Sequence, residues 1–308
     1  MSPASARELL PAAVGALAAA GVGSPEVDAR LLLAHVLRIE PNRLWLDPDV
    51  DLEAQSAFAE LIHRRSQREP LQHLTGVAHF RHLELSVGPG VFVPRPETEV
   101  MTGWAIDRLR ELASAGGQPF VVDLCSGSGA IAAALATETV GVRVAALERS
   151  PEAAAYAAEN LAGSGAELVV ADMAAAPTEW NAGVDLVIAN PPYIPLEAYA
   201  TVEPEARDHD PIEALFSGAD GLDAIRVLVT VAARLLVDGG VLCFEHADVQ
   251  GAAAADVVVA SGDFQTVRDH RDLTDRPRFV TALRHTRVAA HGVSADRGQG
   301  DLLAGWVE

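Results

Sequence analysis

The chain has 308 residues and is 49% hydrophobic, which is enough for a large core and, at about 100–200 residues per domain, for two domains. It contains no lysine, so all 23 basic residues are arginine, and the 43 acidic residues leave a net charge of −20. Because nucleic acids are bound mainly through Lys and Arg contacts to phosphate, this acidic chain without a basic block is not expected to bind DNA or RNA directly.

The sequence predicts no membrane segment, secretory signal or metal site. No stretch reaches the roughly 18 uninterrupted apolar residues of a membrane span, and the N-terminus lacks a basic segment followed by an apolar run. The two cysteines, Cys125 and Cys243, lie in apolar runs and have neither disulfide-framework nor metal-ligand spacing. We therefore expect a cytoplasmic monomer that does not bind membranes and holds no metal.

Residues 1–75 are predicted to form a helical N-terminal domain. Ser5 and Glu8 have the spacing of a capping box, Ser24 is followed by a proline as at a helix start, and residues 51–65 form a further helix. The second helix is expected to use one face for packing, with these side chains on it: Val27, Leu31, Leu32, His35 and Val36. Two interpretations stay open, namely a bundle that only packs on the larger domain and a module that docks a macromolecular substrate.

Residues 76–96 are predicted to form a β-hairpin linker between two domains. The β-like runs 80–87 and 91–93 flank Gly88-Pro89-Gly90, and this arrangement is typical of a hairpin turn. Pro96 then predicts the start of a helix.

Residues 97–285 alternate between strand-like and alanine-rich helical segments. The expected strands are 120–125, 142–147, 168–171, 185–189, 241–245, 264–270 and 279–283. The expected helices between them are 130–137, 151–162 and 222–236. This order predicts an α/β fold with a doubly wound parallel sheet covered by helices on both faces. Residues 286–308 have no periodicity and are predicted to be a flexible tail.

The first strand of this series runs into a glycine-rich turn. Gly127 and Gly129 precede the expected helix, and glycines at such a turn let the backbone approach a ligand at a helix N-terminus. Glu148 follows about 20 residues later at the end of the second strand, where an acid can accept hydrogen bonds from the hydroxyls of an adenosine ribose. At this point NAD and S-adenosylmethionine both remain candidates, as does a turn without a ligand.

Asp172 and Met173 follow the third strand. The carboxylate could accept from the amino group of an adenine and the thioether could pack on its ring, because neighbouring strands of such a sheet end at one crevice. The alternative for Asp172 is a helix cap. Two weaker candidates are His209 between two aspartates, where a solvated acidic loop is favoured over a metal site, and Glu245-His246, which could line the crevice or only end a strand.

The fourth strand stops at Asn190-Pro191-Pro192-Tyr193. Neither proline can continue a sheet ladder, so the turn is stiff, and it presents acceptors in the side-chain oxygen of Asn190 and the carbonyl of Pro191. Such acceptors suit a planar NH2 group, since they can hold both N–H bonds and aim the nitrogen lone pair at a methyl donor. The turn has no evident use in hydride transfer, so it favours S-adenosylmethionine over NAD and makes Asn190, Pro191, Pro192 and Tyr193 the predicted catalytic residues.

These motifs together resemble those of the bacterial peptide chain release factor glutamine N5-methyltransferases, a class I family that uses S-adenosylmethionine. The segments that carry the resemblance are 123–131, Glu148, Asp172 and 190–193, with further blocks at 70–76, 93–99, 213–216, 221–223 and 239–246. It covers roughly residues 5–285, and the block Pro94-Arg95-Pro96-Glu97-Thr98-Glu99 makes it more specific than Asn-Pro-Pro-Tyr alone.

The resemblance implies a Rossmann-like methyltransferase sheet with an antiparallel last strand, joined by the hairpin to a helical N-terminal domain that docks the substrate. It implies methyl transfer to the glutamine of the Gly-Gly-Gln loop in class 1 release factors, with the substrate held by residues 190–193. Together with Asp172, the cofactor contacts expected by position are Cys125, Ser126, Gly127, Ser128, Gly129, Glu148, Met173 and Asn190. This chain departs from the family pattern at Cys125 (usually glycine), Glu148 (commonly aspartate), Met173 (where an aromatic can stand) and Ala247 (often glycine).

Three other interpretations of the sequence stay open. The first is an amino-methyltransferase acting on a flipped adenine in nucleic acid, which the net charge of −20 disfavours. The second is a non-catalytic module that binds an adenosine ligand, which the intact turn at residues 190–193 disfavours. The third is an NAD-dependent oxidoreductase, which only the glycine pattern favours.

Overall fold

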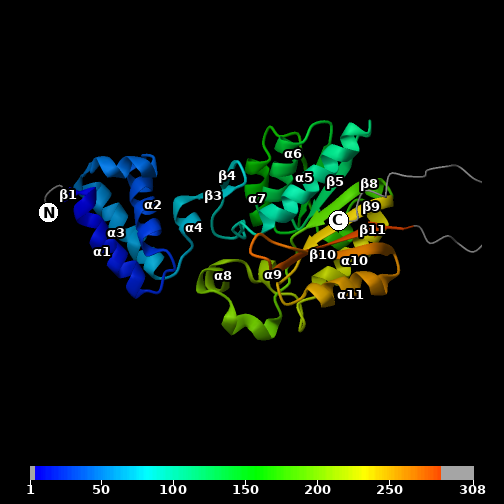
Figure 1. The fold of residues 1–308 in the computed structure, drawn as a ribbon. Coiled ribbons are helices and arrows are strands. Elements are labelled where there is room, and N and C mark those ends of the chain that lie inside the picture. Colours follow the sequence, from blue (N-terminus) through cyan, green and yellow to red (C-terminus); the bar gives the residue numbers. More distant parts are fainter. Residues whose placement is uncertain (1–3, 286–308) are drawn as a thin grey trace, which may run out of the picture.

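The computed structural model describes residues 4–285, so the tail predicted for residues 286–308 lies outside the described part of the chain (Figure 1). The N-terminal part is helical, as predicted. Its elements are β1 (Ala4–Ser5), α1 (Ala6–Ala19), α2 (Pro25–Leu37), η1 (Pro41–Leu46), β2 (Asp49–Val50), α3 (Leu52–Ser66) and α4 (Leu71–Thr75). The first three α-helices share one apolar core, and the short strands β1 and β2 pair antiparallel beside it.

The caps of these helices follow the sequence, whereas the packing face of α2 does so only in part. The capping box at the start of α1 is present, with the Ser5 amide donating to the Glu8 carboxylate at 3.0 Å. On α2, Leu32 is buried and Val36 packs on the core as predicted, but Val27 is 55% exposed and His35 is exposed. The buried side chains of the helix are Asp28, Ala29, Leu32, Leu33 and Ala34. An aspartate lies in this core because it is paired with a buried arginine of α3, which a count of apolar positions cannot detect.

The hairpin is present, but its predicted turn is wrong. It consists of β3 (Val77–Phe80) and β4 (Leu83–Ser86), which pair antiparallel around a turn at Arg81-His82. Arg81 adopts a left-handed φ of 55°, and its backbone amide donates to Glu99 at 3.0 Å. The segment 88–93 follows β4 without strand pairing, and its valines are buried in a small apolar cluster with Ala153 of the C-terminal part, residues 97–285. The apolar, β-branched residues of this segment are therefore explained by burial and not by a strand.

The C-terminal part contains a seven-stranded sheet in the order β10-β11-β9-β8-β5-β6-β7. Its strands are β5 (Phe120–Leu124), β6 (Arg143–Glu148), β7 (Glu167–Val170), β8 (Val184–Ala189), β9 (Leu236–Glu245), β10 (Phe264–Arg271) and β11 (Pro277–Arg284). Strand β11 lies between β9 and β10 and is antiparallel to both, and the remaining neighbours pair parallel. This confirms the predicted doubly wound sheet with an antiparallel last strand.

Helices cover both faces of the sheet, and the strands supply alternate side chains to the two cores (Figure 1). One face carries α5 (Thr98–Ser114), α6 (Ala130–Glu138) and α7 (Pro151–Asn160), and the other carries α10 (Asp223–Leu235) and α11 (Gly251–Ser261). On β5, Val121 packs under the first group, whereas Val122 and Leu124 pack under the second, as the two-residue period of a strand requires. The short helices η2 (Met173–Ala175) and η3 (Thr178–Trp180) follow β7. In the described residues, no helix is both long and apolar enough to cross a membrane.

Between β8 and α10 the chain forms an excursion that the sequence analysis did not predict. Residues 194–217, hereafter the 194–217 loop, contain η4 (Leu196–Thr201), α8 (Pro204–His209) and α9 (Ile212–Leu215). The loop is closed at its base, because the Ile194 amide donates to the Leu215 carbonyl and the Ser217 amide donates to the Ile194 carbonyl, both at 2.9 Å. In Figure 1, α8 lies beneath the hairpin, between the N-terminal helices and the sheet.

Candidate active site

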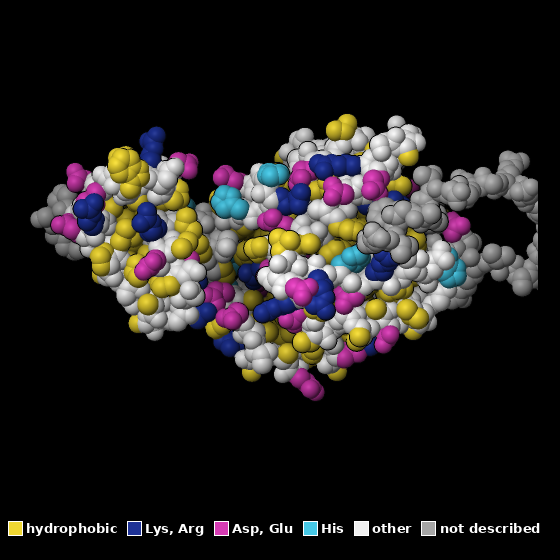
Figure 2. Space-filling view, viewed as in Figure 1, with side chains coloured by type: hydrophobic (Ala, Val, Ile, Leu, Met, Phe, Trp, Pro, Cys, Tyr) yellow, Lys and Arg dark blue, Asp and Glu magenta, His cyan; other side chains and the backbone are white. Residues whose placement is uncertain are grey.

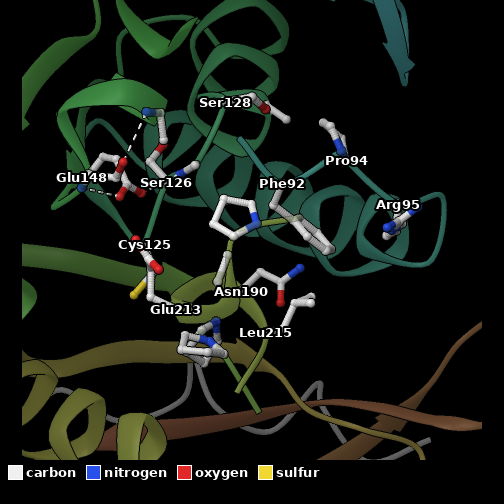
Figure 3. A pocket seen from close by; sticks show the side chains of 18 of the residues that line it. Phe92, Pro94, Arg95, Cys125, Ser126, Ser128, Glu148, Asn190, Glu213 and Leu215 are labelled. Carbon is white, nitrogen blue, oxygen red and sulfur yellow. Dashed lines mark hydrogen bonds between the residues drawn. The ribbon is translucent and has the colours of Figure 1, made fainter. Parts of the chain in front are cut away.

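A cavity of about 490 Å³ opens at the carboxyl ends of β5, β6 and β8 (Figure 3). This is the edge of a doubly wound sheet at which ligands bind. Predicted site residues that line it are Cys125, Ser126, Gly127, Ser128, Glu148, Asp172, Met173, Asn190, Pro191, Pro192 and Tyr193. Gly129 is not part of the lining. The structure thus brings the glycine-rich turn and the Asn-Pro-Pro-Tyr turn to one cavity.

The two glycines of the first turn serve different purposes. Both have left-handed backbones, with φ of 57° at Gly127 and 81° at Gly129. At Gly127 the direction of a Cβ is open space on the cavity side, which leaves room for a ligand close to the backbone. At Gly129 a Cβ would come within 3.3 Å of the Ala157 backbone. Gly129 therefore allows α6 to start tightly against α7, and its predicted contact with a cofactor stays a prediction.

Cys125 occupies a backbone conformation that favours glycine. Its φ is 65°, and a non-glycine residue in this region costs about 1–2 kcal/mol. Its Sγ lies 3.8 Å from the Met173 Sδ at the cavity wall. Burial, with smaller contributions from the Glu148 and Asp123 carboxylates, raises the pKa of the thiol above its usual range, which favours the neutral thiol as part of the cavity wall.

Glu148 organises the glycine-rich turn. Its Oε2 accepts from the Gly127 amide at 2.8 Å and its Oε1 from the Ser150 amide at 2.7 Å, as the dashed lines of Figure 3 show. Each carboxylate oxygen has a second lone pair, so both can still accept from a ligand. Beneath the turn, Asp123 accepts from the Ser126 hydroxyl at 2.6 Å, and burial raises the pKa of Asp123 to about 7.

Asp172 and Met173 differ in their relation to the cavity. The Asp172 side chain is exposed and accepts from the Ala174 amide at 2.9 Å, which is the helix-cap alternative weighed above. Its second oxygen lies 3.9 Å from the Arg149 guanidinium. Met173 is half-buried and packs toward the apolar core under β5. Both residues line the cavity, and their roles toward an adenine stay predictions.

A buried hydrogen-bond network fixes the Asn-Pro-Pro-Tyr turn from behind. The Thr98 hydroxyl donates to Glu245 Oε2 at 2.7 Å, and the Tyr193 hydroxyl donates to Glu245 Oε1 at 3.0 Å. Because the Thr98 hydrogen is used on the carboxylate, Thr98 Oγ1 must act as the acceptor for the Asn190 Nδ2, which lies 3.2 Å away. This orients the Asn190 amide and leaves its Oδ1 available as an acceptor in the cavity.

The sequence analysis missed Thr98 as a site residue and left Glu245 undecided. Thr98 is 4% exposed and Glu245 is 1% exposed, and Glu245 supports the turn without lining the cavity. Gln250 was also missed, and its Nε2 donates to the Tyr193 carbonyl at 2.9 Å. Two features of the sequence could have indicated these residues. Thr98 lies within the Pro-Arg-Pro-Glu-Thr-Glu block, and Glu245 is an acidic residue at the end of an otherwise apolar strand.

Replacing Thr98 with valine is expected to lower kcat about 10- to 100-fold, because the isosteric side chain can neither accept from Asn190 nor donate to Glu245. Thr98→Ser keeps the hydroxyl and is expected to retain most of the activity. Steady-state kinetics with calorimetric cofactor binding provide the check. A Thr98→Ser variant as impaired as Thr98→Val would contradict the role of the hydroxyl.

The network also predicts a pH dependence. Burial raises the pKa of Glu245 above the usual range, although the hydrogen bonds from Thr98 and Tyr193 oppose this. Protonation turns one Glu245 oxygen into a donor and weakens its contact with one of the two hydroxyls. The value of kcat should therefore decrease as the pH drops through this raised pKa and reach a plateau above it. In Glu245→Gln the acid limb should be lost while kcat at neutral pH is lower. An acid limb with the same midpoint in that variant would rule out Glu245 as its source.

Other candidates from the sequence have structural roles. Asp210 follows α8 and pairs with Arg95, with Nη2 and Oδ2 2.9 Å apart, and burial raises the Asp210 pKa to about 6 although Arg95 opposes the rise. His209 has no neighbouring set of ligands, and the described residues contain no group of three or more His, Cys, Asp or Glu placed to hold a metal ion. His246 is fully buried, with its Nε2 3.0 Å from Asp269 Oδ1.

Comparisons with known proteins show which family the chain is similar to. The PrmC N-terminal domain model matches residues 8–76, and the methyltransferase small domain model matches residues 101–202. The chain is 50% identical to a release factor glutamine methyltransferase of Streptomyces coelicolor over 86% of its own length and 93% of that protein. It is 47% identical to a release factor glutamine methyltransferase of Mycolicibacterium smegmatis over 91% and 98%, respectively.

A third relative has another name. The chain is 41% identical to a 4-amino-L-phenylalanine/4-methylamino-L-phenylalanine methyltransferase of Streptomyces pristinaespiralis, over 92% of its own length and 96% of that protein. Identity to the two release factor glutamine methyltransferases is higher, at 50% and 47% with nearly complete coverage. The described chain also has the helical N-terminal part, the hairpin and the sheet that the resemblance implied. The chain belongs to the release factor glutamine methyltransferase family.

Proposed function

We propose that this protein transfers a methyl group from S-adenosylmethionine to the side-chain amide nitrogen (N5) of the glutamine in the Gly-Gly-Gln loop of class 1 peptide chain release factors. The observation that carries the proposal is the oriented Asn190 amide. Its nitrogen is held by Thr98, so its oxygen is the acceptor that remains, and it lies in the same cavity as the glycine-rich turn. An acceptor fixed in this way suits a target that carries a planar NH2 group.

The glycine-rich side of the cavity fits S-adenosylmethionine. The open space at Gly127 admits a ligand near the backbone, Glu148 keeps lone pairs for ribose hydroxyls, and Met173 and Cys125 supply apolar walls. When bound, S-adenosylmethionine supplies a methyl group on a positively charged sulfur, which becomes a neutral thioether as the amide nitrogen is methylated. We assign cofactor binding to residues 125–129, Glu148, Asp172, Met173 and Asn190.

The residues of the Asn-Pro-Pro-Tyr turn would align the target. Asn190 Oδ1 and the Pro191 carbonyl accept its two N–H groups, which holds the amide plane and directs the nitrogen lone pair. The same acceptors favour the positive charge that develops on this nitrogen. Tyr193, held by Glu245, forms the wall beside the target. No residue need act as a strong base, because the proton leaves after the nitrogen has lost its partial double bond.

The choice of a protein target rests on charge, on the N-terminal helices and on the relatives. The net charge is −20, and Figure 2 shows arginines scattered among acidic side chains on the visible face without a continuous basic field. Such a surface does not suit a phosphate backbone. We assign residues 1–75 to substrate docking, 76–96 to the linker and 97–285 to catalysis, in a cytoplasmic monomer with no direct role for nucleic acid or membranes.

The test is a transfer assay with labelled S-adenosylmethionine and a panel of acceptors: a class 1 release factor, DNA, RNA, free glutamine and 4-amino-L-phenylalanine. We expect label in the release factor at a kcat/KM at least about 100-fold above that for any other acceptor. The aromatic amino acid belongs in the panel because a relative is named for it. Label in DNA or in 4-amino-L-phenylalanine, with none in the release factor, would refute the proposed substrate.

A further inference from the structure

Two arginines of the N-terminal part converge on one carboxylate of the 194–217 loop. Arg65 Nη2, on α3, lies 2.9 Å from Glu205 Oε1, and Arg68, which follows the end of α3, donates to both Glu205 oxygens, through Nε at 2.8 Å and Nη2 at 2.5 Å. Glu205 lies on α8, which Figure 1 shows between the N-terminal helices and the sheet. This three-residue cluster, hereafter the Glu205 clamp, joins elements that are 137 to 140 residues apart in sequence.

The side chains of the Glu205 clamp are largely buried and are held by further hydrogen bonds, unlike those of a solvent-exposed ion pair. The side chains are 7% exposed at Arg65, 18% at Glu205 and 21% at Arg68. Arg65 is also held by Asp28 of α2 at 2.8 Å, and Arg68 donates to the Gly21 carbonyl at 3.0 Å. Burial alone would raise the pKa of Glu205, but hydrogen bonds from the two arginines lower it, so the carboxylate is charged. Two-pronged Arg–carboxylate pairs of this kind fix orientation as well as proximity.

Glu205 also lines the cavity of the candidate active site. The loop that carries it begins directly after Tyr193 and is closed at its base, so a displacement of α8 would be transmitted to the wall of the target pocket. A second ion pair joins the 194–217 loop to the linker, because Arg95, at the end of residues 76–96, pairs with Asp210 of this loop. The wall of the target pocket is therefore tied both to the N-terminal helices and to the linker.

We propose that Glu205 is a positioning residue that locks the N-terminal helices to the wall of the target pocket. A protein bound by those helices is then held at a fixed distance and orientation from the opening of the target pocket. The binding of a small acceptor, which does not contact the helices, does not depend on the lock. The identity of the protein target rests on the proposed function, but the lock itself does not. Glu205 acts through the arginines and the loop, and not on the reacting nitrogen.

The test compares Glu205→Gln with Glu197→Gln. Glu197 lies on η4 of the same loop, but it is exposed and does not line the cavity. For Glu205→Gln we expect the KM for the release factor to rise about tenfold, with kcat and the cofactor Kd within about twofold of wild type. The KM for a short Gly-Gly-Gln peptide should not change in this variant. For Glu197→Gln all four constants should stay within about twofold.

A second measurement does not depend on the substrate. Amide hydrogen exchange in residues 196–215 should be faster in Glu205→Gln than in wild type, and unchanged in Glu197→Gln. Unchanged exchange in Glu205→Gln would overturn the lock. Faster exchange in Glu205→Gln with an unchanged KM for the release factor would overturn the positioning role. If exchange is faster in Glu205→Gln but the wild-type enzyme does not methylate release factor, the proposed function is refuted and the lock is not.

A further variant guards against misfolding. Arg68→Gln leaves the buried pair between Arg65 and Asp28 intact and removes the two-pronged contact with Glu205. It should reproduce the rise in KM and the faster exchange while its thermal unfolding midpoint stays close to that of wild type. If Glu205→Gln raises the KM and Arg68→Gln does not, the clamp is not the cause.

Discussion

Replacing Asn190 with alanine is expected to lower kcat for methyl transfer by about 1000-fold or more while changing the cofactor Kd less than about threefold. The variant loses the oriented acceptor that Thr98 fixes, and with it the alignment of the target amide. The glycine-rich turn and Glu148, which form the other side of the cavity, keep their hydrogen bonds. Single-turnover kinetics and calorimetry of cofactor binding measure the two effects separately.

Asn181→Ala is the matched control, because Asn181 is exposed and does not line the cavity. It should leave both constants near those of wild type. If cofactor affinity and turnover fell together by the same factor in Asn190→Ala, Asn190 would serve the cofactor and the proposed alignment of the target would be wrong.

Gly221→Ala is expected to destabilise the fold by about 2–4 kcal/mol and to remove most of the activity. The backbone at Gly221 has a φ of 78°, and a Cβ there would overlap the Tyr193 carbonyl oxygen and lie 2.5 Å from Gln250 Nε2. Relief of this overlap must displace the turn or break its hydrogen bond with Gln250. Chemical denaturation and kcat measurements on the same preparation provide the check.

The control for this change is Gly163→Ala. Gly163 has nearly the same backbone conformation, with a φ of 76°, but a Cβ there meets nothing within 4 Å. It should cost about 1 kcal/mol, which is the conformational penalty alone, and leave kcat unchanged. Equal losses of stability and activity in the two variants would show that the contact with the turn at Tyr193 is irrelevant.

Sequence patterns were sufficient to predict the sheet and the proximity of the glycine-rich turn to the Asn-Pro-Pro-Tyr turn. Apolar runs marked the strands, and the rule that parallel strands share their carboxyl edge placed residues 125–129 near Asn190. The antiparallel last strand came from the family resemblance, and the structure confirms it. In contrast, the turn of the hairpin was predicted at Gly88–Gly90, because glycine and proline are strong turn signals, whereas the chain turns at Arg81.

The supporting contacts could not be predicted, because they depend on residues that only the fold brings together. Thr98 and Glu245 are 147 residues apart, and no periodic pattern connects them. The 194–217 loop has short helices without a long amphipathic repeat, so its position over the cavity could not be derived from the sequence. Similarly, Asp28 breaks the apolar face of α2, and only its contact with Arg65 explains why it is buried.

The most direct test of the central claim is to map the methyl group. A class 1 release factor and its variant with the glutamine of the Gly-Gly-Gln loop replaced by alanine are incubated with the enzyme and labelled S-adenosylmethionine, then digested and analysed by mass spectrometry. The account predicts one methyl group on the side-chain amide of that glutamine and no label in the variant. Label that persists in the variant, or that lies on another residue, would contradict it.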